Sequence, residues 1–227
     1  MFLSRVSRGL ASKSLPSSAS ISIGRRGAAA APSATAAART RRSLCAWGGI
    51  VGDDAPTAED IGNLQDEFRA DPESAKFVLE STSKLTTGLR STATIREKFE
   101  IPSDEPGKFG GTDTAPSPVE IILASLGTCQ EITYKAYAQA MKIPVLSVSL
   151  KIEGDIDMRG FFSVDPNVRP GIQKIRGVAT VETPTSVSTQ LVEELKAVVD
   201  THCPVSDMLG AVPTEITLEH VQTSTKI

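Results

Sequence analysis

The sequence predicts an α+β fold, in which strands, a long helix, further strands, a second helix and a last strand follow one another. Short segments with alternating apolar and polar residues indicate the strands. Two longer segments with apolar residues three or four positions apart indicate the helices. Because the strands come in runs, without the strict alternation that a parallel sheet requires, we expect antiparallel sheets with the helices packed on them.

Charge divides the chain into a basic leader and an acidic body. Residues 1–52 hold eight of the 24 Lys and Arg residues and none of the 27 acidic residues, so the remainder carries a formal charge of −11. The leader is rich in Ser and Ala, which is typical of an organelle transit peptide. We expect a disordered transit peptide over residues 1–52, a linker with a short helix over 53–74 and one domain over 75–227.

The arginines near the N-terminus favour a mitochondrial destination, with a plastid as the alternative. The leader has a second interpretation, a basic tail that binds nucleic acid or anionic lipid. A body with a charge of −11 would repel nucleic acid, and the chain has no run of about 18 apolar residues that could span a bilayer. We therefore expect neither a nucleic-acid partner nor a membrane span.

The first elements follow from local patterns. Residues 57–70 predict a short helix, since Thr57 and Asp60 have the spacing of a capping box and apolar residues follow at helical intervals. Residues 75–99 alternate and predict two or three antiparallel strands. Residues 102–117 form a loop rich in Pro, Gly and Asp, and we expect this loop to shape the mouth of a site on the helix that follows.

A long helix should begin close to Pro118, with Ser117 as its N-cap. Apolar and small residues leave almost no polar face before Gln130, which predicts a helix buried on most sides. Cys129 lies deep in this run. A lone buried cysteine is more often packing than chemistry, so its interpretation depends on the rest of the chain.

The remaining elements alternate between sheet and helix. A second amphipathic helix is predicted over residues 185–202, with Ser186 or Ser188 as its cap. Alternating patterns predict a strand on either side of it and another directly after the long helix. These strands cover residues 145–158, 172–183 and 215–221.

Three cysteines are too few for a disulfide framework in a chain of this size. Cys45 lies in the leader, so processing would leave Cys129 and Cys203. Each lies at a helix bordered by Pro, Gly or small residues, and the two could face one another in the fold. Two thiols in a reducing compartment suggest transient redox chemistry rather than a structural crosslink.

Other chemistries have little support in the sequence. A zinc site of Cys129, His202, Cys203 and His220 is the metal alternative, but no CxxC or HxxxH spacing supports it. His202 is expected in the last turn of its helix, where it complements the helix dipole. Nucleotide-binding and serine-hydrolase motifs do not occur in the sequence, so we expect no bound cofactor.

Two motifs in order resemble one family. The motifs G-T-D-x-x-P-S-P-x-E-x-x-L-A-x-L-G-x-C, ending at Cys129, and C-P-V-S-x-x-L, beginning at Cys203, are similar to those of the OsmC/Ohr family, the osmotically inducible and organic hydroperoxide resistance proteins. The likeness covers about residues 75–222 and is closer to the less characterised OsmC-like branches. It implies antiparallel sheets packed around a long central helix that carries Cys129, with a second helix ending at Cys203.

The resemblance also implies a function. Cys129 would be the peroxidatic thiol that is oxidised to a sulfenic acid, and Cys203 would resolve it as an intramolecular disulfide. An apolar setting suits the tail of an organic hydroperoxide. The implied partners are this substrate, a dithiol reductant of the lipoyl type and a second copy of the chain in an interlocked homodimer.

Candidate supporting residues are Glu120, Arg90 and Arg96. A peroxidatic cysteine reacts as its thiolate, so a positive charge or a helix dipole should stabilise it, and the two arginines are candidates on the first sheet. Glu120 precedes Cys129 by nine positions, a rotation of roughly 900°, which places it half a turn away on the helix. As an acid in the first turn it also suits the helix dipole.

The alternative function is a non-enzymatic OsmC-like module that binds an apolar ligand or senses redox state. Peroxide consumption that depends on Cys129 would favour the enzyme, whereas none at all would favour the module.

Overall fold

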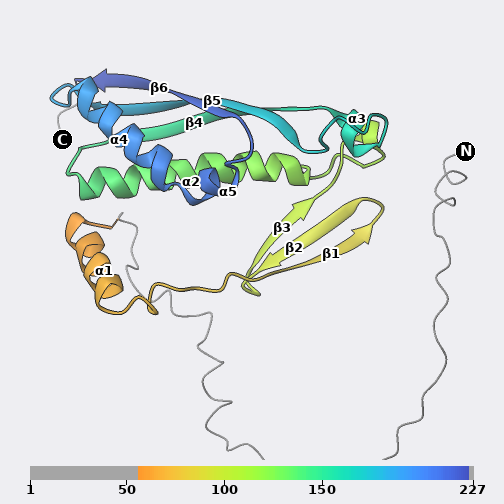
Figure 1. Ribbon diagram of the computed structural model, residues 1–227, viewed down its shortest axis with the longest axis horizontal. Helices are drawn as coiled ribbons and strands as arrows, with labels where there is room; N and C mark the ends of the chain where they lie inside the picture. Colours follow the sequence, from red (N-terminus) through yellow and green to blue (C-terminus); the bar gives the residue numbers. More distant parts are fainter. Residues whose placement is uncertain (1–55, 225–227) are drawn as a thin grey trace, which may run out of the picture. The chain divides into compact units, whose positions relative to one another are not determined.

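The computed structural model describes residues 56–224, and its helices and strands form the α+β arrangement that the sequence predicts (Figure 1). The predicted transit peptide, residues 1–52, lies outside the described residues. Among the helices that are described, none combines the length and the apolar character needed to cross a bilayer. The proposed boundaries of the leader, linker and domain stay predictions.

Helix α1 (Ala58–Ala70) begins where the sequence predicts it. The Thr57 hydroxyl accepts a hydrogen bond from the main-chain N–H of Asp60, and the Asp60 carboxylate accepts one from the N–H of Thr57. This reciprocal capping satisfies two donors that the first helical turn leaves without helical partners. No residue of α1 is buried, so the helix adds little to the core.

The first sheet has three antiparallel strands in the order β1, β2, β3, which confirms the strands predicted after α1. Regular structure begins at Ser81, somewhat later than the alternating pattern suggests. Every residue of β1 is exposed and none of β2 or β3 is buried, so this sheet has no core of its own within the chain. The strands are β1 (Ser81–Thr87), β2 (Arg90–Ile95) and β3 (Phe99–Ser103).

The loop after β3 is organised around the buried carboxylate of Asp104. Its Oδ2 accepts hydrogen bonds from the main-chain N–H and the hydroxyl of Thr112, at 3.1 and 2.6 Å, and from the same two groups of Thr114, at 3.1 and 3.0 Å. The N–H of Glu105 donates to the other oxygen. These bonds hold the Thr112–Thr114 segment against the end of β3, just before the long helix.

Two glycines shape the same loop. The 3₁₀ helix η1 (Gly107–Phe109) ends at Gly110, whose φ of 93° lies in the left-handed region that favours glycine. At Gly111, any Cβ would overlap the main-chain carbonyl of Glu105. Both positions therefore require glycine, which the loop's composition had suggested.

Helix α2 (Pro118–Ala140) confirms the predicted start, because Ser117 is its N-cap and Pro118 its first residue. The prediction that it is buried on most sides is wrong for the single chain. Ile122 is 42% exposed and Ile132 is 70% exposed. The apolar pattern extends around the helix, but only one face packs against the chain's own sheet. The buried residues are Leu126, Gly127, Gln130, Thr133, Tyr134 and Ala138.

The second sheet has the order β4, β5, β6 and is mixed. β4 (Ser147–Ile156) pairs antiparallel with β5 (Ile172–Pro184), through a connection that contains α3 (Met158–Phe161). β6 (Thr214–Thr223) pairs parallel with β5, which corrects the expectation of antiparallel sheets throughout. Two helices connect β5 to β6, and such a crossover is what parallel pairing requires.

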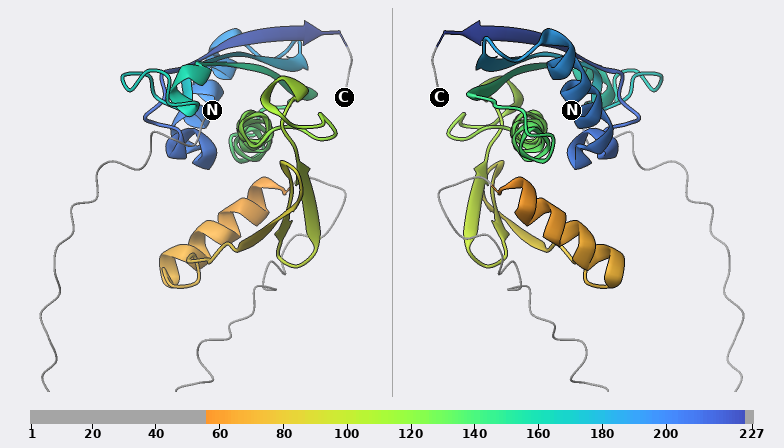
Figure 2. Two further views of the ribbon diagram at one scale, coloured as in Figure 1. Left: turned by 90° about the vertical axis from the view of Figure 1, so that its right-hand side faces the viewer. Right: turned by 90° about the vertical axis from the view of Figure 1, so that its left-hand side faces the viewer.

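The core lies between this second sheet and the helices. α4 (Thr189–His202) begins at the cap Ser188, as predicted, and α5 (Pro204–Met208) follows directly. Helices α2, α4 and α5 lie on one face of the β4–β6 sheet (Figure 2). The side chains that fill this layer are fully or almost fully buried. They include Tyr134 and Ala138 from α2, Ala179 and Val181 from β5, and Val192, Leu195 and Val199 from α4.

Candidate functional site

Two helices bring the two remaining cysteines together. Cys129 lies near the middle of α2, and Cys203 lies at the junction of α4 and α5, where it is the C-cap of one helix and the N-cap of the other. Both thiols are free, and His202 and Pro204, on either side of Cys203, line the same pocket as Cys129. Residues 74 positions apart in the sequence are thus neighbours in the fold.

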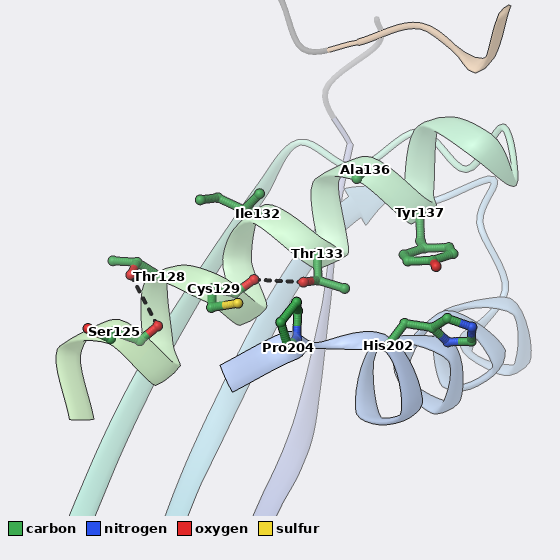
Figure 3. Close-up of a pocket in the computed structure, with 9 residues that line it drawn as sticks. All are labelled: Ser125, Thr128, Cys129, Ile132, Thr133, Ala136, Tyr137, His202 and Pro204. Atoms are coloured by element: carbon green, nitrogen blue, oxygen red, sulfur yellow. Dashed lines mark hydrogen bonds between the residues drawn. The ribbon is translucent and has the colours of Figure 1, made fainter. Parts of the chain in front are cut away.

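Cys129 opens onto a pocket of about 390 Å³ beside α2 (Figure 3). One face of α2 and the α4–α5 junction form the wall of the pocket. The surface of this wall is mainly apolar. In Figure 3 the Cys129 sulfur points toward the segment that carries Pro204. A small molecule in this pocket would reach Cys129. The lining residues are Ser125, Thr128, Cys129, Ile132, Thr133, Ala136, Tyr137, His202 and Pro204.

The pKa values of the two thiols are shifted in opposite directions. Burial raises the pKa of Cys129, and the contact with Cys203 raises it further, although the main-chain N–H of Val205 acts in the other direction. Burial also opposes ionisation of Cys203, but hydrogen bonds from the hydroxyl and N–H of Ser206, and from Cys129, outweigh it and lower its pKa.

Gln130 and Ser206 join α2 to α5 close to the two cysteines, and neither residue is a candidate from the sequence. The side-chain Nε2 of Gln130 donates a hydrogen bond of 3.1 Å to the Ser206 hydroxyl oxygen. Gln130 is 2% exposed, and its Oε1 is buried without a partner among the described residues. One signal was available in the sequence, because Ser206 follows Cys203 by three positions, the spacing of an N-cap residue and its N3 partner.

The three candidate supporting residues do not meet the thiols. Glu120 accepts a hydrogen bond of 2.7 Å from the N–H of Ser117 and completes the capping box of α2, and this bond lowers its pKa. Its carboxylate lines a separate hollow between α2 and β4. The guanidinium of Arg96 lies 5.0 Å from the centre of the Phe99 ring, and Arg90 is exposed on β2. Neither arginine lines the Cys129 pocket.

The two histidines have structural contacts. The His202 Nδ1 lies 2.9 Å from the carbonyl oxygen of Val198, and its ring packs 5.0 Å from the ring of Tyr137 at one end of the pocket. His220, on β6, lies between the hydroxyls of Thr183 and Thr189. Within residues 56–224 no three His, Cys, Asp or Glu side chains are grouped as metal ligands would be.

The arrangement suits thiol chemistry. The Cys129 sulfur is accessible from a mainly apolar pocket, and the buried Cys203 lies between His202 and Pro204, which line the same pocket. Oxidation of the accessible sulfur would place an electrophile near a second thiol, which is what disulfide formation requires.

Comparisons with known proteins agree with the fold. A family model described as OsmC-like protein matches residues 111–219. An OsmC-like protein from Mycoplasma pneumoniae has 19% sequence identity and a TM-score of 0.56, over 64% of this chain and 99% of that chain. An OsmC-like protein of unknown function from Vibrio cholerae has 12% identity and a TM-score of 0.53, over 64% and 100%.

A third solved structure belongs to a protein that is named for its function. It is an organic hydroperoxide resistance protein from Elizabethkingia anophelis, with 14% identity and a TM-score of 0.50, over 65% of this chain and 98% of that chain. At such identities the likeness concerns the fold. No curated protein sequence matches this chain significantly.

Proposed function

We propose that this chain, whose residues 111–219 match the OsmC-like protein family model, is a thiol-dependent peroxidase that reduces organic hydroperoxides, with Cys129 and Cys203 as the reacting thiols. The observation that carries the proposal is the free thiol of Cys129 in an apolar pocket that His202 and Pro204, the chain neighbours of the second free thiol Cys203, also line. The protein from Elizabethkingia anophelis, which has this fold, is named for organic hydroperoxide resistance.

The first step is attack by the Cys129 thiolate on the terminal oxygen of the hydroperoxide. A sulfur–oxygen bond forms and the O–O bond breaks. The peroxide is reduced to an alcohol, whose oxygen takes up a proton, and Cys129 is oxidised to a sulfenic acid. The side chains of Ile132, Ala136 and Pro204 would hold an apolar tail near the sulfur.

The second step is attack by the Cys203 thiolate on the Cys129 sulfur. The disulfide forms, the sulfur–oxygen bond breaks, and hydroxide leaves and is protonated to water. A dithiol reductant, such as a lipoyl group, then restores both thiols by two exchange reactions and is itself oxidised to a disulfide. The cycle uses no bound cofactor.

A homodimer is part of this proposal. Ile132 lines the Cys129 pocket and is 70% exposed, and the first sheet presents Leu85 and Phe99 at 64% and 43% exposure. Apolar surface of this kind favours association. A second copy would cover it and close the pocket to water, which suits an apolar substrate.

The cellular role follows from the activity and the leader. Reduction of organic hydroperoxides serves defence against oxidative stress, and residues 1–52 would direct the protein to a mitochondrion, or to a plastid as the alternative. A fluorescent protein fused after residues 1–52 tests the destination, and a cytosolic signal would contradict it.

The test of the activity is peroxide consumption by the protein without its leader. With cumene hydroperoxide and dihydrolipoamide we expect turnover that falls to the uncatalysed level in Cys129→Ser. Cys203→Ser should still reduce one equivalent of peroxide but not turn over with the dithiol at the same rate. Turnover that is unchanged in Cys129→Ser would contradict the proposed roles.

The second candidate function is a module that binds an apolar ligand or senses redox state. The exposed apolar surface and the raised pKa of Cys129 favour it, since a protonated thiol reacts slowly with peroxide. No peroxide consumption, together with disulfide formation only under strong oxidants, would favour this module over the enzyme.

A further inference from the structure

The Cys129 pocket runs lengthwise along α2, from Ser125 to Tyr137. Cys129, Thr133 and Tyr137 follow one another at intervals of four residues, so they lie on one face of the helix. Tyr137 comes eight residues after Cys129, which places it about 12 Å farther along the helix axis. A ligand that lies along this part of the pocket can therefore touch both residues.

The two threonines of the pocket use their hydroxyl protons within α2. The Thr133 hydroxyl donates to the Cys129 carbonyl oxygen at 2.8 Å, and the Thr128 hydroxyl donates to carbonyl oxygens of the preceding turn at 3.0 and 3.3 Å. Because a hydroxyl has one proton, neither threonine can also donate to a ligand. Ile132 and Ala136 complete the wall between Cys129 and the far end of the pocket, which suits an apolar chain.

Tyr137 and His202 form a polar end of the pocket (Figure 3). The centres of their rings are 5.0 Å apart, and the ring planes meet at 53°. Within residues 56–224, neither the Tyr137 hydroxyl nor the Nε2 atom of His202 has a hydrogen-bond partner. Two polar groups that the described chain leaves unpaired thus lie side by side at one end of a mainly apolar pocket.

Contacts within α4 fix the position of the proton on the His202 ring. Its Nδ1 lies 2.9 Å from the Val198 carbonyl oxygen and 2.8 Å from the Thr201 hydroxyl oxygen. The Thr201 hydroxyl gives its own proton to the carbonyl oxygen of Ala197 or Val198, at 3.1 or 3.0 Å, so both neighbours of Nδ1 are acceptors. Nδ1 therefore carries the proton, and in the neutral imidazole Nε2 is an acceptor.

We propose that Tyr137 and His202 form a subsite for a neutral head group, a hydroxyl or a carboxamide, on an aliphatic ligand whose other end reaches Cys129. The head group donates a hydrogen bond to His202 Nε2 and accepts one from the Tyr137 hydroxyl. The chain of the ligand lies over Ile132 and Ala136. The identity of the other end rests on the proposed function, under which it carries the hydroperoxide.

Charge and distance limit the ligand further. A carboxylate has no proton to donate to Nε2, and it would lie at the C-terminal end of α4, where the helix dipole disfavours an anion. An extended chain of single bonds advances about 1.2 Å per bond, so a distance of about 12 Å corresponds to about ten bonds. About eight carbons should therefore separate the oxygen of the head group from the peroxide.

The first experiment uses ligands without a peroxide. Alkylation of Cys129 by iodoacetamide in the full chain is followed by mass spectrometry of its peptide, at about pH 8, where an imidazole in water is neutral. We expect octan-1-ol and octanamide to slow the alkylation. Octanoate and 1-methoxyoctane cannot donate to Nε2, and they should need roughly fivefold higher concentrations for the same protection. Equal protection by octanoate and octan-1-ol, or no protection by any of them, would overturn the subsite.

Two variants test the residues one at a time. Tyr137→Phe keeps the ring and removes the hydroxyl, whereas His202→Asn keeps a donor for the Val198 carbonyl and removes Nε2. Each should weaken the protection by octan-1-ol about three- to tenfold, relative to the alkylation rate of the same variant without ligand. In His202→Asn, octan-1-ol should protect no better than 1-methoxyoctane, which a purely structural role would not produce. A preserved preference for octan-1-ol would refute the role of Nε2.

Hydroperoxides of matched length separate the subsite from the proposed function. With an excess of dithiothreitol, kcat/KM for 8-hydroperoxyoctan-1-ol should exceed that for 8-hydroperoxyoctanoate by roughly fivefold, and by about twofold or less in His202→Asn. If neither peroxide is consumed but octan-1-ol still protects Cys129, the peroxidase is refuted and the subsite is kept. Equal kcat/KM values for the two peroxides in the wild type would refute the role of the subsite in the choice of substrate.

Discussion

The two three-stranded sheets of this protein differ in what covers them. The β4–β6 sheet carries three helices on one face, and its residues Ile175, Ala179 and Val181 are fully buried. The β1–β3 sheet contributes no buried residue, although Leu85 and Phe99 are large and apolar. One sheet is stabilised inside the chain, and the other presents apolar surface outward.

We expect the two sheets to contribute to different processes, the β4–β6 sheet to folding of the chain and the β1–β3 sheet to its association with a second copy. A small sheet needs a packed hydrophobic face to be stable, and the β1–β3 sheet has none within the chain. The free energy of folding should therefore come mainly from the helices packed on β4–β6, and the β1–β3 sheet should gain its packing from a second copy. The following predictions test each half of that statement.

The largest effect is expected in the covered sheet's core. Leu195→Ala removes a side chain that is 0% exposed, and it should lower the free energy of unfolding by about 2–5 kcal/mol in urea denaturation. Leu85→Ala is the matched control, since Leu85 is 64% exposed, and at concentrations where the chain is monomeric it should cost less than about 0.5 kcal/mol. Similar losses for the two variants would show that both sheets contribute to the stability of the single chain.

The exposed sheet should control association. Leu85→Glu combined with Phe99→Glu places two charges on apolar surface, and it should weaken the dimer by at least about 100-fold in analytical ultracentrifugation, since each buried side chain contributes about 1.5–3 kcal/mol. Val178→Glu, at a 37% exposed position on β5, is the control and should leave the dimer intact. A wild-type chain that is monomeric at all concentrations would refute the idea.

The loop between the first sheet and α2 should be sensitive to one methyl group. Gly111→Ala would force a Cβ onto the Glu105 carbonyl, and the overlap should cost about 1–3 kcal/mol of unfolding free energy. Gly127→Ala meets only the Ile152 side chain at 3.7 Å, so it should be neutral or stabilise α2 by up to about 1 kcal/mol. If both variants melt like the wild type, the loop is less constrained than its contacts imply.

The smallest effect is a pH dependence of the same loop. Hydrogen bonds from Thr112, opposed by burial and assisted by those from Thr114 and Glu105, hold the pKa of Asp104 well below its usual range. A depressed folded-state pKa contributes stability above the unfolded pKa of about 3.9, and this contribution is lost as pH falls below it. Urea midpoints between about pH 5 and 3 should fall less steeply in Asp104→Asn than in the wild type.

Much of the secondary structure was predictable because its determinants are local. Ser117, Pro118 and Ser188 lie where a capping residue or a first-turn proline is expected, and helices α2 and α4 begin there. Alternating residues likewise predicted β4 and β5. Such signals depend on neighbours within a few positions, so the rest of the fold does not change them.

The errors concern contacts between distant parts of the chain. The apolar residues of α2 predicted burial, but a sequence pattern does not say whether the covering surface belongs to the same chain, and Ile132 is exposed. The parallel pairing of β6 depends on how the α4–α5 crossover passes over the sheet. No local pattern near Thr214 specifies that direction.

The candidate site was predicted in part. The roles of Cys129 and Cys203 came from a resemblance in motifs and stay predictions, and in the structure the residues on either side of Cys203 line the Cys129 pocket. Glu120, Arg90 and Arg96 were candidates because of their residue type. In the fold Glu120 caps α2, Arg96 packs on the Phe99 ring, and Arg90 is exposed on β2. Ser206 and Gln130 were missed because neutral amide and hydroxyl groups carry no signal in charge or hydropathy.

The position of Cys203 between two helices has a consequence for heat stability. A disulfide to Cys129 would fasten the α4–α5 junction to the middle of α2 and close a loop of about 75 residues. Restricting the unfolded chain in this way should stabilise the oxidised protein by about 4 kcal/mol. The melting temperature of the oxidised protein would then be higher than that of the reduced protein.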